Sequence, residues 1–149
     1  MVVYVGFLKK LFLRKVIYRF TYYLCKMNKS AKKIVIFDDD EDILSICVYI
    51  LEEQGWEVYT YTNCNNIVER ISEIKPDVIL MDNWIPDEGG IIATQILKKE
   101  KSLQQIPVIY FSANSDIQLL AEHAGADGYL AKPFDLEELD RVIGDVMVK

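Results

Sequence analysis

The side chains best suited to chemistry in this sequence stand directly after short apolar runs. Asp38 and Asp39 follow IVIF, Asp82 follows VILM, Ser112 follows VIYF and Lys132 follows YLA. Runs of this length are typical of buried parallel strands, whose carboxyl ends lie at one edge of a sheet. If these strands pack side by side, three carboxylates, one hydroxyl and one ammonium group converge on a shallow pocket.

Three carboxylates that lie close together raise one another's pKa unless a cation is present among them. Oxygen ligands on a water-accessible surface suit Mg²⁺, which keeps several of its waters and needs few carboxylates. A metal ion and a lysine together can neutralise the oxygens of a phosphoryl group while a carboxylate attacks it. The next acidic residues, Asp40, Glu41 and Asp42, need no such role, because negative charge is favourable where a helix begins.

The elements that must position these groups alternate regularly from Lys32 onward. Predicted strands cover Lys33–Phe37, Glu57–Thr60, Val78–Met81, Val108–Phe111 and Gly128–Leu130. Predicted helices cover Ile43–Gln54, Asn65–Ile74, Ile91–Lys99, Ile117–Ala124 and Leu136–Met147. This alternation predicts an α/β fold, a doubly wound five-stranded parallel sheet with right-handed crossovers.

The charge of the 149-residue chain is unevenly distributed. Residues 1–30 carry seven of its 17 basic residues and no acidic one, so residues 31–149 hold the other ten and all 23 acidic residues, a net charge of −13. So negative a domain argues against nucleic-acid binding. The cysteines, Cys25, Cys47 and Cys64, are odd in number and lack metal-like spacing, which favours reduced thiols in a cytoplasmic protein.

Residues 1–30 form a basic, apolar N-terminal extension that we treat separately from residues 31–149. Their longest uncharged stretch is far shorter than the roughly 20 residues that a membrane-spanning helix needs. Two interpretations stay open. Leu8, Phe12, Val16 and Phe20 recur every fourth residue, as in a basic amphipathic helix through which residues 1–29 would contact a membrane surface. Alternatively, translation begins at Met27.

Four segments of the sequence together resemble a known family. KIVIFDDDEDIL, VILMDNWIPDEGG, PVIYFSA and GADGYLAKPF are similar, in content and order, to the signature blocks of the receiver domain of two-component response regulators. The resemblance spans Lys32 to Lys149. It implies the flavodoxin-like strand order 2-1-3-4-5, which is the order known for the family member CheY.

The resemblance also implies a role for each polar residue at the strand ends. Asp82 corresponds to the phosphoacceptor, and Lys132 to the lysine that pairs with the phosphoryl group. Asp39 corresponds to a direct Mg²⁺ ligand and Asp38 to its partner, which acts through water. The remaining roles are the backbone carbonyl of Trp84 as a further metal ligand, the Ser112 hydroxyl as a phosphoryl contact, and Tyr129, with Ser112, as the switch.

The loop after Asp82 follows the family pattern with two departures. Pro86 and Gly90 match the turn that shapes this loop. Gly89 replaces the aspartate that is common before the loop glycine, and Trp84 is bulky for its position. The resemblance further implies a cis peptide bond between Lys132 and Pro133.

The leading functional expectation is a stand-alone receiver that is no enzyme beyond its own phosphorylation and dephosphorylation. A sensor histidine kinase or a histidine phosphotransfer protein would supply the phosphoryl group, and a protein target would contact roughly Ile117–Val148. One alternative is a phosphohydrolase of the haloacid dehalogenase type, which would use an Asp-x-Asp pair such as Asp38 and Asp40. Another is a degenerate receiver that acts as a constitutive binding module.

Overall fold

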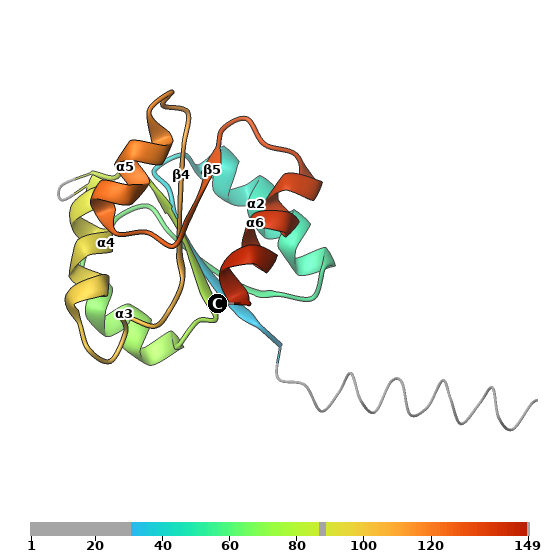
Figure 1. Ribbon diagram of the computed structural model, residues 1–149. Helices are drawn as coiled ribbons and strands as arrows, with labels where there is room; N and C mark the ends of the chain where they lie inside the picture. Colours follow the sequence, from blue (N-terminus) through green and yellow to red (C-terminus); the bar gives the residue numbers. More distant parts are fainter. Residues whose placement is uncertain (1–30, 87–88, 149) are drawn as a thin grey trace, which may run out of the picture. The chain divides into compact units, whose positions relative to one another are not determined.

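The computed structural model describes residues 31–86 and 89–148, so the predictions made for residues 1–30 lie outside the described residues. Within the described part, five strands alternate with five helices (Figure 1). The strands are β1 (Lys33–Phe37), β2 (Glu57–Tyr61), β3 (Val78–Asp82), β4 (Val108–Ser112) and β5 (Gly128–Ala131). The helices are α2 (Glu41–Glu53), α3 (Ile67–Ile74), α4 (Gly89–Lys99), α5 (Ile117–Ala124) and α6 (Leu136–Met147).

The strands form one parallel sheet in the order β2-β1-β3-β4-β5. This confirms the predicted α/β class and the CheY-like strand order. Every residue of β3 and β4 is buried, which explains why these strands have continuous apolar runs rather than alternating ones. Strand order reverses between β1 and β3, so their carboxyl ends border the crevice where ligands bind in sheets of this kind.

Helices cover both faces of the sheet and enclose two apolar clusters. Helices α3, α4 and α5 lie on one face and α2 and α6 on the other (Figure 1). The first cluster includes Met81 and Tyr110 from the sheet. The second includes Leu80 and Phe111, the neighbours of those residues along the same strands. Successive strand residues therefore point to opposite faces, and this alternation sets the direction of the side chains at the strand ends.

The observed boundaries differ from the predicted ones by one or two residues. Strands β2 to β5 each extend one residue further. In β3 and β4 the hydrogen-bonded ladder continues past the last apolar side chain of the run. Asp82 pairs with Phe111 and Ser112 with Ala131 in this ladder, so both polar residues belong to strands. Helix α3 starts two residues later than predicted because Asn66 has a left-handed backbone conformation with φ 52°.

Helix α2 starts earlier than predicted because Asp40 caps it. The Asp40 carboxylate accepts hydrogen bonds from the backbone N–H groups of Asp42 and Ile43, at 2.9 and 3.3 Å. Acidic residues in the first turn also interact favourably with the positive end of the helix dipole. Helix capping therefore explains part of the acidic run from Asp38 to Asp42.

Among the described residues, no helix is long and apolar enough to cross a membrane.

Candidate functional site

The predicted polar residues gather at the carboxyl ends of four neighbouring strands. Asp38 follows β1, Asp82 ends β3, Ser112 ends β4 and Lys132 follows β5. They line one open cleft of about 500 Å³. Its other lining residues are Asp39, Asp40, Ile43, Asn83, Trp84, Ala113 and Asn114. The structure thus brings together every predicted catalytic and metal-binding residue, while Tyr129, the predicted switch, lies outside this lining.

Lys132 joins the two buried carboxylates of the cleft. Its Nζ atom lies 2.6 Å from Asp38 Oδ2 and 2.7 Å from Asp82 Oδ1. The same ammonium group lies 4.2 Å from the ring centroid of Phe111, whose face adds a cation–π attraction. These contacts hold the charge of Lys132 beside the Asp82 carboxylate.

The protonation behaviour of this pair follows from burial and pairing. Burial raises the pKa of Asp82 above its usual range, although Lys132 and the Trp84 N–H act in the opposite direction. Burial alone would lower the pKa of Lys132, but its hydrogen bonds to Asp38 and Asp82 outweigh that effect and raise the pKa. The ammonium group therefore stays protonated between its two carboxylate partners.

The carboxylates of the cleft fit a divalent cation. Asp38, Asp39 and Asp82 each offer a carboxylate oxygen, and these oxygens lie within 4.8 Å of one another. Lys132 supplies one positive charge against three negative ones, so the cluster keeps an excess of negative charge. Hard, charged oxygen ligands that face a water-accessible cleft suit Mg²⁺.

Comparison with known proteins identifies the family. The sequence profile of the response regulator receiver domain matches residues 34–144. This chain belongs to that family. The match includes all four strand ends that line the cleft, and the receiver fold accounts for the order of the strands.

Solved structures agree with this assignment. The chain is 28% identical to a two-component response regulator from Clostridium difficile, covering 79% of this chain and 97% of that one, with a TM-score of 0.70. It is 25% identical to the receiver domain of a sensor histidine kinase from Pseudomonas aeruginosa, covering 80% and 100%, with a TM-score of 0.73. That structure holds a magnesium ion coordinated in its active-site cleft. The chemotaxis protein CheY4 from Vibrio cholerae, 22% identical over 78% and 99%, shares the fold with a TM-score of 0.71.

Close contacts hold the main chain from Asp82 to Trp84 in this receiver. The Trp84 backbone N–H donates a hydrogen bond to Asp82 Oδ2 at 2.5 Å. A Cβ atom at Gly90 would lie 1.9 Å from the Asp82 carbonyl oxygen, so this position requires glycine. The Trp84 indole itself points outward and is 78% exposed. The main chain of Trp84 is therefore held at the site while its side chain lies at the surface.

Ser112 and Tyr129 occupy different surroundings. Ser112 is buried at the end of β4, and its Oγ atom accepts a hydrogen bond from the Asn114 N–H at 3.2 Å. Tyr129 pairs with Tyr110 across the β4–β5 ladder, and the residue is 43% exposed. The Tyr129 hydroxyl lies 3.5 Å from Gln118 Oε1, a long contact with α5. The switch role of Tyr129 stays a prediction, whereas the cis bond between Lys132 and Pro133 is confirmed.

Sequence reasoning missed two contributions to the site. Asn83 lines the cleft, and the buried hydroxyl of Tyr110 donates a hydrogen bond to its side chain. An asparagine after an aspartate gives no signal of its own, and a tyrosine inside an apolar run is interpreted as an ordinary core residue. Only the fold brings these two side chains together.

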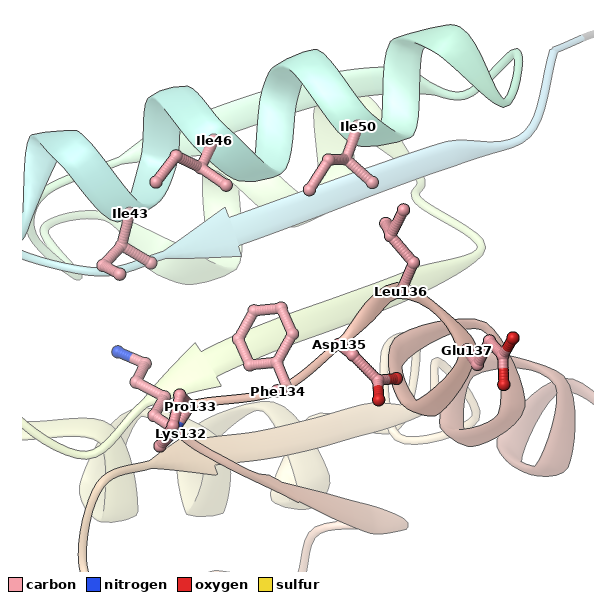
Figure 2. Close-up of a pocket in the computed structure, with 9 residues that line it drawn as sticks. All are labelled: Ile43, Ile46, Ile50, Lys132, Pro133, Phe134, Asp135, Leu136 and Glu137. Atoms are coloured by element: carbon pink, nitrogen blue, oxygen red, sulfur yellow. The ribbon is translucent and has the colours of Figure 1, made fainter.

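An apolar groove of about 680 Å³ adjoins the cleft. Figure 2 shows Ile43, Ile46 and Ile50 on α2 pointing toward Phe134 and Leu136, which precede and begin α6. Ile43 and Lys132 line both the groove and the cleft. The groove is therefore continuous with the site that holds Asp82.

Proposed function

We propose that this receiver accepts a phosphoryl group on Asp82 in a Mg²⁺-dependent reaction and signals by protein–protein contact. The observation that carries the proposal is the position of Asp82, whose Oδ1 atom lies 2.7 Å from Lys132 Nζ at the floor of an open acidic cleft. A carboxylate placed there can act as a nucleophile, and the ammonium group can neutralise charge on the incoming phosphoryl oxygens.

The phosphoryl group would come from a phosphohistidine side chain of the donor protein. An oxygen of the Asp82 carboxylate attacks phosphorus, the P–N bond to the donor imidazole breaks, and the imidazole nitrogen takes up a proton from water. The product is an acyl phosphate on Asp82. Lys132 pairs with a phosphoryl oxygen, and the Ser112 hydroxyl, at the neighbouring strand end, donates a hydrogen bond to another.

The residues that would hold Mg²⁺ are Asp39, Asp82 and the Trp84 carbonyl directly, with Asp38 acting through water. When bound, the metal would neutralise carboxylate and phosphoryl oxygens. The magnesium ion in the Pseudomonas aeruginosa receiver supports this proposal. In this chain, the support is the excess negative charge of the three clustered carboxylates.

A phosphodonor protein must cover the cleft in order to reach Asp82. The natural extension of its footprint is the adjoining groove, whose exposed apolar side chains include Ile46 and Leu136. Asp135 and Glu137 also line this groove. We therefore propose a sensor histidine kinase or a histidine phosphotransfer protein that presents a helix with aliphatic residues flanked by basic ones.

The output contact is proposed for roughly Ile117–Val148. Leu119 on α5 and Tyr129 on β5 are both exposed there, and exposed large apolar side chains favour a protein partner. The receiver would then be no enzyme beyond its own phosphorylation and dephosphorylation. We place it in the cytoplasm, where the buried cysteines Cys47 and Cys64 would stay reduced.

The phosphohydrolase alternative has weaker support. It would use Asp38 and Asp40 as a catalytic pair, but Asp40 Oδ1 already accepts two backbone hydrogen bonds as the cap of α2. The alternative also leaves Asp82, the carboxylate paired with Lys132, without a role.

Intact mass after treatment with acetyl phosphate and Mg²⁺ tests the proposal. The wild-type chain should gain one phosphoryl group, and Asp82→Asn should gain none. Asp116→Asn, which changes an exposed aspartate before α5, is the matched control and should be labelled like the wild type. Undiminished labelling of Asp82→Asn would contradict the proposal, and steady turnover of p-nitrophenyl phosphate would favour the phosphohydrolase.

A further inference from the structure

Tyr110 places a phenol in the middle of a fully buried strand. Its side chain has no exposed surface and belongs to the same apolar cluster as Met81, Ile85 and Ala93. Phenylalanine would fill almost the same space without a polar atom. Since a buried hydroxyl group without a hydrogen-bond partner is destabilising, its partner shows what the tyrosine contributes.

That partner is the residue next to the phosphoacceptor. The Tyr110 hydroxyl donates a hydrogen bond to Asn83 Oδ1 at 2.5 Å. Burial, together with the charge of Asp82, raises the pKa of Tyr110 to about 12, so the phenol keeps the proton that it donates. The hydrogen bond therefore links the core of β4 to the loop that follows β3.

Asn83 is also held through its backbone. Its carbonyl oxygen accepts a hydrogen bond from the Gly90 N–H at 3.2 Å, where α4 begins. Close contact between Gly90 and the Asp82 carbonyl brings the start of α4 against the same segment. The main chain after Asp82 is thus fixed between β4, through a side chain, and α4, through the backbone.

We propose that Tyr110 and Asn83 form a positioning pair that fixes the main chain from Asp82 to Trp84. Their hydrogen bond would hold two groups in place: the Asp82 carboxylate, which accepts the Trp84 N–H, and the Trp84 carbonyl, which would bind Mg²⁺. Tyr110 does not line the cleft that would hold the metal and the phosphoryl group, so it would act only through Asn83. The consequence for Mg²⁺ rests on the proposed function, whereas the fixing of the loop does not.

The first measurement is hydrogen exchange of the Trp84 amide in the full-length, metal-free protein. Tyr110→Phe removes only the hydroxyl group, and we expect exchange of this amide to become about tenfold faster, because local opening becomes easier. Mg²⁺ binding, followed by calorimetry, should weaken about tenfold, as for other residues that orient metal ligands. Tyr59→Phe is the matched control, since it removes a tyrosine hydroxyl that donates to Glu57 at the surface. It should change neither quantity.

A double-mutant cycle separates this pair from a general effect on packing. Asn83→Ala should reproduce the effect of Tyr110→Phe on hydrogen exchange of the Trp84 amide. Exchange in the double variant should be little faster than in either single variant. Unchanged Trp84 exchange in Tyr110→Phe would overturn the proposal. Fully additive effects of the two substitutions would overturn it as well.

The two proposals fail in different ways. If the wild-type chain bound no Mg²⁺ and gained no phosphoryl group, the proposed function and the metal consequence would both be wrong. The exchange of the Trp84 amide would still show whether the Tyr110–Asn83 pair fixes the loop. If the wild type bound Mg²⁺ and Tyr110→Phe bound it equally well, the positioning role toward the metal would be wrong while the proposed function stood.

Discussion

Lys132 Nζ donates a hydrogen bond to Asp82 Oδ1 at 2.7 Å, although 50 positions separate the two residues in the chain. The strand order makes this contact possible, because β4 alone lies between β3 and β5. Lys132 also reaches Asp38, 94 positions away, at 2.6 Å. One ammonium group therefore connects the ends of three strands and compensates part of their negative charge.

Replacing Lys132 should destabilise the receiver. In Lys132→Met, Asp38 and Asp82 lose their shared cation while staying buried, and removing one partner of a buried pair typically costs about 3–5 kcal/mol. We expect a loss of about 3 kcal/mol in the free energy of unfolding, measured in urea without Mg²⁺. Added Mg²⁺ should recover part of this loss, because the metal supplies positive charge to the same carboxylates.

Arg141→Met is the matched control for this prediction. Arg141 pairs with Asp145 on α6, but both side chains are largely exposed, so the pair contributes at most about 1 kcal/mol. If Lys132→Met were no less stable than Arg141→Met, the charge compensation inferred for Lys132 would be wrong.

Asp39 should contribute more to Mg²⁺ affinity than Asp38 does. The Asp38 carboxylate is buried and already accepts hydrogen bonds from Lys132 and from the Asp40 N–H, whereas Asp39 is exposed at the mouth of the cleft. Asp39→Ala should therefore weaken Mg²⁺ binding by about tenfold or more, and Asp38→Ala by less, in calorimetric titrations. Asp42→Ala, in the first turn of α2, should leave the affinity unchanged. Equal losses for Asp38→Ala and Asp39→Ala would show that their assigned roles are wrong.

The fold was predictable mainly because its central strands, β1, β3 and β4, are buried on both faces. A strand such as Val78–Asp82 has a continuous apolar run that stops where the chain emerges, so the polar residue at its end stands out. The same logic located Asp38, Ser112 and Lys132. The ends of β3 and β4 were placed one residue too early because side-chain polarity does not report the last hydrogen bond of a ladder.

Contacts that depend on tertiary packing were not predictable. Tyr110 and Asn83 are 27 positions apart, and neither residue type is unusual where it stands. The groove was also missed, because helical periodicity assigns Ile43, Ile46 and Ile50 to an apolar face without showing how much of that face α6 leaves uncovered. Ile46 is in fact 55% exposed.

The stability of the receiver should fall as pH rises above about 9, in part through Cys47. Burial, and then the charge of Asp38, raises the pKa of the Cys47 thiol from 9.0 to about 11. Between these values the folded protein keeps a proton that the unfolded chain releases, so the thiol destabilises the folded state progressively as pH rises. By pH 10 this contribution amounts to about 1.4 kcal/mol.

Urea unfolding of the wild type and Cys47→Ala at pH 8 and pH 10 measures this contribution. The Cys47→Ala variant has a lower starting stability because it leaves a small cavity, so the quantity to compare is the change with pH. That change should be smaller in Cys47→Ala. An equal decline in both proteins would mean that other groups, such as Tyr110, account for all of it.

The last prediction concerns the groove beside the cleft. If a phosphodonor protein covers this groove, a charge at its centre should hinder docking without touching the chemistry, because Ile46 lines the groove but not the cleft. Ile46→Asp should therefore slow phosphorylation by a phosphohistidine protein that is first shown to label the wild type. We expect at least a tenfold effect, since burying an unpaired carboxylate in an apolar interface is strongly unfavourable.

Two comparisons make this prediction specific to docking. Labelling by acetyl phosphate should be unchanged in Ile46→Asp, because a small donor reaches Asp82 without covering the groove. Ile92→Asp is the matched control: Ile92 is 52% exposed on α4, on the other face of the sheet, and should tolerate the charge. Equal slowing in Ile46→Asp and Ile92→Asp would indicate a general effect of charge. If Ile46→Asp accepted the phosphoryl group from the protein donor at the wild-type rate, the donor would not use the groove, and its footprint would be confined to the rim of the acidic cleft.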